Sequence, residues 1–304
     1  MQEYDVIIIG SGPAGLTASI YTGRAQLTTL ILEGATLGGN TALTDHIDNY
    51  PGFPDGIGGV ELIDNMWTQA QRFGAELKYE QAVGLKDLGD LKQVITNSGD
   101  YLARSVIVAV GVKRRELGLS KESEFIGRGI SYCATCDGAF FQGAPVAVVG
   151  GGESALKEAL YLSNIASRVH LIHWLGSYQA NPSVVEKVLG TGNIIVHLNK
   201  TVKEINGEDY LQKLVLEDTL TKTKEELEAE GLFISIGMIA SGEFLQPLLK
   251  HEDGYVLTND DLELATSMPG VFAAGDIRHK IVRQVATAVG DGAIAGMAVT
   301  EFLK

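Results

Sequence analysis

Two cysteines three positions apart are the residues of this sequence best suited to chemistry. Cys133 and Cys136 are the only cysteines of the 304-residue chain, and they stand in the stretch YCATCDG. One sulfur of such a pair can attack a mixed disulfide that the other has formed. A helix beginning here would lower the pKa of the attacking thiol, and Asp137 can move a proton to or from the departing thiolate. The motif predicts a redox dithiol with an adjacent acid.

Zinc binding and an inert disulfide are the alternative uses of this pair. A structural zinc site needs four ligands, and the six histidines show no spacing that would supply the other two. A disulfide across three residues closes a loop too small to stabilise the fold much. Asp137 has an alternative as well, because an aspartate before Gly138 is a common turn residue.

A glycine-rich turn near the N-terminus predicts a dinucleotide site. Residues 6–9 form an uninterrupted β-branched run, typical of a parallel strand covered on both faces. A G-x-G-x-x-G turn and a helix follow, and the helix start directs free N–H groups at phosphates. Glu33 ends the next strand, where an acid accepts a hydrogen bond from a ribose hydroxyl. The turn consists of Gly10, Ser11, Gly12, Pro13, Ala14 and Gly15.

The same pattern recurs 140 residues later. Residues 145–174 again indicate a strand, a glycine turn, a helix and a strand. The turn places glycines at 150 and 152 and Ala155 third, where alanine is also accepted. The position of Glu33 is taken by His173, so this second unit lacks its acid. We therefore expect an α/β fold with two Rossmann-like dinucleotide-binding domains.

Composition narrows the possible partners. The net charge of −14 argues against a nucleic-acid partner. No apolar run reaches the roughly 18 residues that a membrane-spanning helix needs. The first ten residues lack the basic head and cleavage site of a signal peptide, and we expect a cytoplasmic location.

Five stretches, in order along the whole chain, carry a family resemblance. GSGPAG, NYPGFP, CATCDG, VVGGGESALKEALYL and GVFAAGDI together resemble the low-molecular-weight, bacterial-type thioredoxin reductases. The resemblance implies a class II pyridine nucleotide-disulfide oxidoreductase with FAD as cofactor, thioredoxin as partner and a homodimeric state. Residues 1–114 and 242–304 would form the FAD-binding domain. Residues 115–241 would form a central NAD(P)-like domain that carries the dithiol.

The resemblance also implies roles for individual residues. The first glycine turn would hold the FAD pyrophosphate, with Glu33 at the adenosine ribose and Asp276 at the ribityl chain; a plain helix cap is the alternative for Asp276. Cys136 would face the flavin, and Cys133 would attack thioredoxin with Asp137 as acid/base. The other residues implied to hold the flavin are Gly39, Asn40, Thr41, Asn49, Gly111, Gln284, Val285 and Ala286.

The electron donor is the open question. NADPH-dependent members of this family carry H-R-R-x-x-x-R after the second-unit strand, whereas residues 173–179 are HWLGSYQ. Without those arginines, binding of the 2′-phosphate should weaken by orders of magnitude. We favour a donor such as reduced ferredoxin, with NADH and NADPH as alternatives. An oxygen-using dithiol oxidase and a non-enzymatic redox sensor are the competing functions.

Two basic clusters could dock an acidic ferredoxin. They comprise residues 113–115 and residues 278–280 on an otherwise acidic chain, and charge complementarity raises association rates. The alternative is that both are solvated loop patches.

Overall fold

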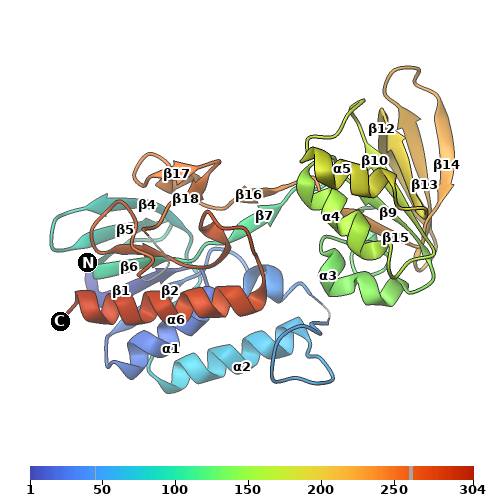
Figure 1. Ribbon diagram of the computed structural model, residues 1–304. Helices are drawn as coiled ribbons and strands as arrows, with labels where there is room; N and C mark the ends of the chain where they lie inside the picture. The colour runs from blue at the N-terminus through green and yellow to red at the C-terminus, as the bar shows by residue number, and fades with distance from the viewer. Residues whose placement is uncertain (45, 260–262) are drawn as a thin grey trace. The chain divides into compact units, whose positions relative to one another are not determined.

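The computed structural model, shown in Figure 1, describes residues 1–44, 46–259 and 263–304. The chain forms two compact units: Met1–Lys113 with Ile239–Lys304, and Arg114–Met238. It crosses between them twice, in short strands that pair with each other, β7 (Val112–Arg114) and β16 (Met238–Ala240).

A seven-stranded sheet forms the frame of the first unit. Its order is β3-β2-β1-β6-β5-β4, and β19 also pairs with β6. The pairs among β1, β2, β3, β6 and β19 are parallel, and those of β4 and β5 are antiparallel. The bounds are β1 Gln2–Ile9, β2 Thr29–Leu32, β3 Glu76–Lys78, β4 Ala82–Asp87, β5 Lys92–Thr96, β6 Asp100–Val108 and β19 Val271–Ala273, with a small β17–β18 hairpin at His251–Glu252 and Tyr255–Val256.

The α-helices of the described part of this unit are α1 (Pro13–Arg24), α2 (Gly59–Arg72) and α6 (Val285–Phe302). α6 runs beside α1 (Figure 1), and small residues permit the close approach. A Cβ at Gly292 would come within 2.3 Å of the Ala14 carbonyl oxygen, so only glycine fits there. Short 3-10 turns complete the unit at Gly39–Thr41, Glu243–Leu245 and Gly275–Ile277.

The second unit contains a five-stranded and a three-stranded sheet. The larger has the order β11-β10-β9-β15-β8, and the smaller is antiparallel, β12-β13-β14. The strands are β8 Ile130–Ser131, β9 Pro145–Val149, β10 Arg168–His173, β11 Ile194–Leu198, β12 Lys200–Gly207, β13 Leu211–Asp218, β14 Lys224–Glu228 and β15 Gly231–Ile234. The helices are α3 Ala134–Asp137, α4 Glu153–Leu162 and α5 Pro182–Leu189, with 3-10 turns at Ser123–Phe125 and Gly138–Phe141.

The internal repeat appears in the strand register. In the first unit Ile7 pairs with Leu30, and in the second Ala147 pairs with His170. Both members of the second pair lie 140 positions after their counterparts, the offset of the glycine turns. The two predicted Rossmann-like units are therefore confirmed as strand–turn–helix–strand repeats. Within the described part of the chain, none of the helices is both long and apolar enough to cross a bilayer.

Candidate active site

The first glycine turn has the geometry that a pyrophosphate site needs. Gly10 has φ +106°, and a Cβ at Gly15 would lie 2.0 Å from the Gly10 carbonyl oxygen, so both positions require glycine. A Cβ at Gly12 would have no atom nearer than 4.0 Å. Gly12 is also the N-cap of α1, which continues through Pro13 and Ala14. The turn thus offers an open backbone surface at a helix start, which suits a phosphate group.

Glu33 lies at this turn, where the sequence placed it. Its Oε2 accepts hydrogen bonds from the N–H and the hydroxyl of Ser11, at 3.0 and 2.6 Å, and its Oε1 accepts from the Ala35 N–H. Each carboxylate oxygen has two lone pairs, so Glu33 retains capacity to accept from a ribose hydroxyl.

The residues expected around the flavin come from several elements of the first unit. The side chain of Asn40 donates to the Val112 carbonyl at 2.8 Å, and Asn49 donates to the Gln284 side chain at 3.1 Å. Gln284 is the N-cap of α6 and forms a capping box with Thr287. Gly39 and Thr41 lie in one 3-10 turn, Gly111 has φ +65°, Val285 is half-buried and Ala286 is exposed.

Asp276 has a buried oxygen that suits a hydroxyl ligand. Within the described chain its Oδ1 accepts no hydrogen bond, and burial raises the pKa of the carboxyl group. Lys280 Nζ lies 3.6 Å away, an ion-pair distance too long for a hydrogen bond. Asp276 lies in the turn after β19 and is not the cap of α6, whose N-cap is Gln284. A buried acceptor that receives no hydrogen bond from the described residues fits a ribityl hydroxyl of FAD.

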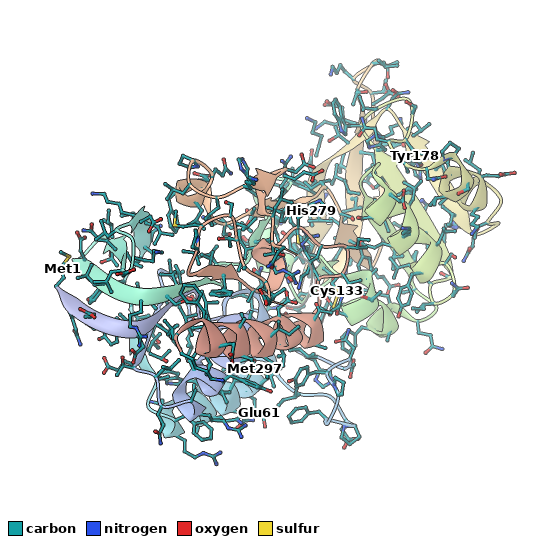
Figure 2. The ribbon with its side chains drawn as sticks, turned by 60° about the vertical axis from the view of Figure 1, so that its left-hand side comes forward. Met1, Glu61, Cys133, Tyr178, His279 and Met297 are labelled. Atoms are coloured by element: carbon teal, nitrogen blue, oxygen red, sulfur yellow. A yellow bond between two sulfur atoms is a disulfide. The ribbon has the colours of Figure 1, made fainter. Side chains whose placement is uncertain are left out.

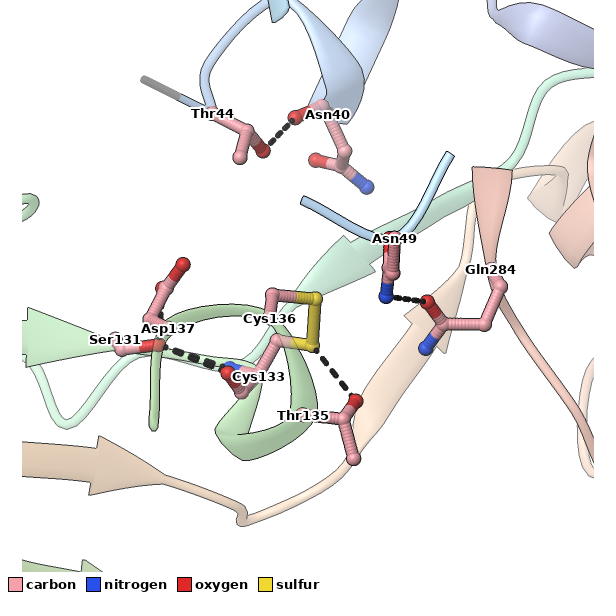
Figure 3. The surroundings of a disulfide bond; sticks show 9 residues. All are labelled: Asn40, Thr44, Asn49, Ser131, Cys133, Thr135, Cys136, Asp137 and Gln284. Atoms are coloured by element: carbon pink, nitrogen blue, oxygen red, sulfur yellow. Dashed lines mark hydrogen bonds between the residues drawn. A yellow bond between two sulfur atoms is a disulfide. The ribbon is translucent and has the colours of Figure 1, made fainter. Parts of the chain in front are cut away.

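Cys133 and Cys136 form a disulfide in the second unit (Figure 3). Cys133 is the N-cap of the short helix α3, and both cysteines are half-buried. The hydroxyl of Ser131 accepts from the Cys133 N–H at 3.1 Å and donates to Asp137 Oδ2 at 2.5 Å. Ser131 is 4% exposed and paired with Phe233 in the sheet. The buried Ser131 hydroxyl therefore links the Asp137 carboxylate to the backbone of Cys133.

Ser131 was not singled out in the sequence. The only signal would have been its place two residues before the first cysteine, and serine is too common for that to be specific.

Of the two basic clusters noted in the sequence, the one at residues 278–280 is not a surface cluster. Arg278 is 5% exposed and bonded to Asp291 at 2.8 Å, and Lys280 bonds Asp291 at 2.9 Å. Of these three residues only His279 is classed as exposed; it is labelled in Figure 2. The expectation of a solvated 278–280 patch is therefore wrong, because Arg278 is buried, Lys280 is half-buried, and both pair with the Asp291 carboxylate. In the other cluster, Arg114 lies over the ring of Tyr132, with its charge near enough to act on Asp137.

The second glycine turn is in contact with His173. The imidazole packs on Gly151, where an added Cβ would come within 2.1 Å of the ring. His173 is 3% exposed and stacks on Tyr178, and burial lowers its pKa, which keeps it neutral at pH 7. Gln179 donates its N–H to the Gly151 carbonyl at 2.8 Å. No cation stands among residues 173–179 to meet a phosphate.

A half-buried acid in the second unit, Glu158, whose Oε2 is fully covered, was also missed in the sequence. It lies on α4, and burial raises its pKa to about 7. In the sequence Glu158 directly follows Lys157, and such a charged pair is typical of an exposed helix face, so the sequence did not mark it.

Comparisons with known proteins match this chain over nearly its whole length. The family model of the pyridine nucleotide-disulphide oxidoreductases matches residues 4–292. The thioredoxin reductase of Treponema pallidum (strain Nichols) is 42% identical, over 99% of this chain and 97% of its own length. That of Bacillus subtilis (strain 168) is 43% identical, over 99% of this chain and 95% of its own.

Solved structures give the same result. The thioredoxin reductase from Streptococcus pyogenes MGAS5005 is 39% identical with a TM-score of 0.94, covering 99% of this chain and 98% of its own. A ferredoxin-flavin thioredoxin reductase from Clostridium acetobutylicum is 32% identical with a TM-score of 0.54, and the match covers 100% of this chain and 99% of that one.

Proposed function

Because the chain belongs to the pyridine nucleotide-disulphide oxidoreductases, as an FAD-dependent oxidoreductase of the thioredoxin reductase type, we propose that it reduces the disulfide of thioredoxin. Electrons pass through FAD and the Cys133–Cys136 dithiol. The donor is one other than NADPH, and reduced ferredoxin is the favoured candidate.

The observation that carries this proposal is the disulfide with its fixed acid. Cys133 and Cys136 are bonded to each other, and the Ser131 hydroxyl hydrogen-bonds both the Cys133 N–H and the carboxylate of Asp137, the residue after Cys136. A structural disulfide would need no proton donor at its side. A dithiol that opens and closes does, because each departing thiolate takes up a proton.

The exchange balances in two displacements. The Cys133 thiolate attacks one sulfur of the thioredoxin disulfide, which forms a mixed disulfide and releases the other thioredoxin sulfur as a thiolate. The Cys136 thiolate then attacks Cys133, which re-forms the Cys133–Cys136 disulfide and releases the second thioredoxin thiolate. Asp137 exchanges the protons. When bound, FAD supplies the two electrons that open the Cys133–Cys136 disulfide again.

The choice of donor rests on residues 173–179. A 2′-phosphate needs charge-assisted hydrogen bonds from arginine or lysine, and this segment offers a buried neutral His173, an exposed Trp174 and no cation. The similarity to a ferredoxin-flavin thioredoxin reductase supports ferredoxin. The alternative is an NAD(P)H donor, which the retained glycine turn at Gly150–Gly152 supports.

Anaerobic mixing separates these donors. The oxidised protein is mixed in turn with NADPH, NADH and reduced ferredoxin, and bleaching of the flavin band is followed by stopped flow. Prompt bleaching by reduced ferredoxin and slow bleaching by NADPH are expected. Prompt bleaching by micromolar NADPH would contradict the choice of donor. Peroxide release from a small dithiol, with thioredoxin inert, would instead indicate an oxidase.

A homodimer and a cytoplasmic location complete the proposal. The homodimer follows from the family resemblance, and the cytoplasmic location is the expectation drawn above from the sequence. Light scattering on the purified protein tests the first, and fractionation of the source cells tests the second.

A further inference from the structure

Asp291, in the second turn of α6, is a buried charged residue to which the proposed cycle gives no part. It is 8% exposed and accepts three hydrogen bonds. Its Oδ1 accepts from Arg278 Nη1 at 2.8 Å. Its Oδ2 accepts from the Gly275 N–H at 3.0 Å and from Lys280 Nζ at 2.9 Å. One carboxylate therefore fixes both ends of the loop that carries Asp276.

Lys280 lies between two carboxylates but hydrogen-bonds only one of them. Its Nζ is 2.9 Å from Asp291 Oδ2 and 3.6 Å from Asp276 Oδ1. Asp276 Oδ1 is consequently a buried acceptor without a hydrogen bond among the described residues. Leaving such a group unsatisfied is unfavourable, so the arrangement holds an acceptor open for a ligand.

The loop has little freedom to rearrange. Gly275 has φ +78°, and a Cβ there would lie 2.9 Å from the Cβ of Ala14 on α1. Arg278 is 5% exposed, and its guanidinium also donates to Thr258 Oγ1 at 3.2 and 3.3 Å. The backbone is held against α1 on one side and Arg278 is held on the other. Lys280 Nζ is held by Asp291 at 2.9 Å and, at the longer distance of 3.4 Å, by Thr287 Oγ1, so its side chain is the group most able to shift when Asp291 is replaced.

We propose that Asp291 is a positioning residue for FAD binding: it holds Lys280 away from Asp276, so that Asp276 Oδ1 stays available to a ribityl hydroxyl. The inference rests on the proposed role of Asp276. Without the Asp291 charge, Lys280 would close the remaining gap and form a charge-assisted hydrogen bond with Asp276. That bond would occupy the oxygen that the cofactor needs.

The test is the affinity of the FAD-free full chain for FAD, measured by quenching of flavin fluorescence. Asp291→Asn keeps the shape and an acceptor oxygen but removes the charge, and should weaken FAD binding by about tenfold or more. Adding Lys280→Met to Asp291→Asn removes the competing cation and should restore most of the affinity. A purely structural role predicts the opposite order, because the double variant loses a further buried bond.

Asp64→Asn, an exposed aspartate on α2, is the matched control and should bind FAD as the unsubstituted protein does. Asp291→Asn with unchanged affinity would overturn the inference, and so would a double variant weaker than the single one. If Asp291→Asn does not fold, the double variant decides alone: it must fold and bind FAD within about tenfold of the native affinity. Thioredoxin reduction by the native chain is measured separately, so failure of the proposed function would be recognised independently.

Discussion

At the scale of single residues, Asp137 is the group whose removal should affect the exchange step most selectively. Asp137→Asn cannot carry the proton, and should slow reduction of thioredoxin by the pre-reduced protein by about 10²-fold. FAD binding should not change, because the residues proposed to bind FAD lie in the other unit. Single-turnover stopped flow measures the rate. Asp90→Asn, an exposed aspartate, is the control, and a native rate in Asp137→Asn would show that the acid lies elsewhere.

His170 makes a pH-dependent contribution to stability. Its pKa is lowered from 6.5 to about 4, first by burial and then by the charges of His197 and Arg168. The unfolded chain therefore binds more protons between these values. The stabilisation is complete above pH 6.5 and is lost as the pH falls toward 4. It is on the order of 1–2 kcal/mol after allowance for solvent screening.

Replacing this histidine should flatten the pH dependence. In His170→Gln, the free energy of unfolding from urea titrations should fall less between pH 6.5 and 4 than in the native protein. Part of the slope should remain, because burial also lowers the pKa of His173 and His197. An unchanged slope would refute this assignment.

The sequence singles out a position most clearly where the chemistry allows few residue types. Cys133, Cys136 and Glu33 stand in patterns with few other uses, and the structure places Glu33 at its turn. The roles of Ser131, Lys280 and Asp291 could not be predicted, since each depends on a partner that only folding brings near. The basic residues at 278–280 resembled a surface patch because their partner, Asp291, is brought near them only by folding.

At the scale of elements, the contact of α6 with α1 is the most sensitive to side-chain volume. Gly292→Val would drive a branched side chain into the Ala14 carbonyl oxygen, 2.3 Å from the first added atom. We expect a loss of about 1–3 kcal/mol in the free energy of unfolding, with weakened FAD binding. Calorimetry and flavin titration measure the two effects.

The matched control lies two residues earlier on the same helix. A Cβ at Gly290 meets nothing within 4 Å, so Gly290→Ala should be tolerated and should stabilise the protein by up to about 1 kcal/mol. Equal destabilisation by both substitutions would mean that helix propensity, and not contact with α1, governs this site.

Elements were predictable where glycine is sterically required. Backbone atoms lie so close to Gly10 and Gly150 that no side chain fits at either position, which is why both turns could be recognised in the sequence. The 140-residue offset between the turns also holds in the strand register. The antiparallel β12–β14 sheet was not predicted, because its strands alternate weakly and carry many charged residues.

At the scale of the whole molecule, each unit contains one of the two tryptophans, Trp67 in the first and Trp174 in the second. Single Trp→Phe variants therefore let each unit be followed alone by fluorescence. FAD added to the cofactor-free chain should raise the melting temperature reported by Trp67 more than that reported by Trp174, since a ligand stabilises the unit that binds it. Equal shifts would mean that the units unfold together.

The central claim is that Cys133 attacks the thioredoxin disulfide and that Cys136 resolves the mixed disulfide. It is tested most directly by trapping that intermediate on reduced Cys136→Ser and Cys133→Ser variants, followed by mass spectrometry. The Cys136→Ser variant should accumulate a covalent complex with thioredoxin through Cys133, and Cys133→Ser should accumulate none. A complex formed through Cys136 instead, or thioredoxin turnover retained by either variant, would contradict the account.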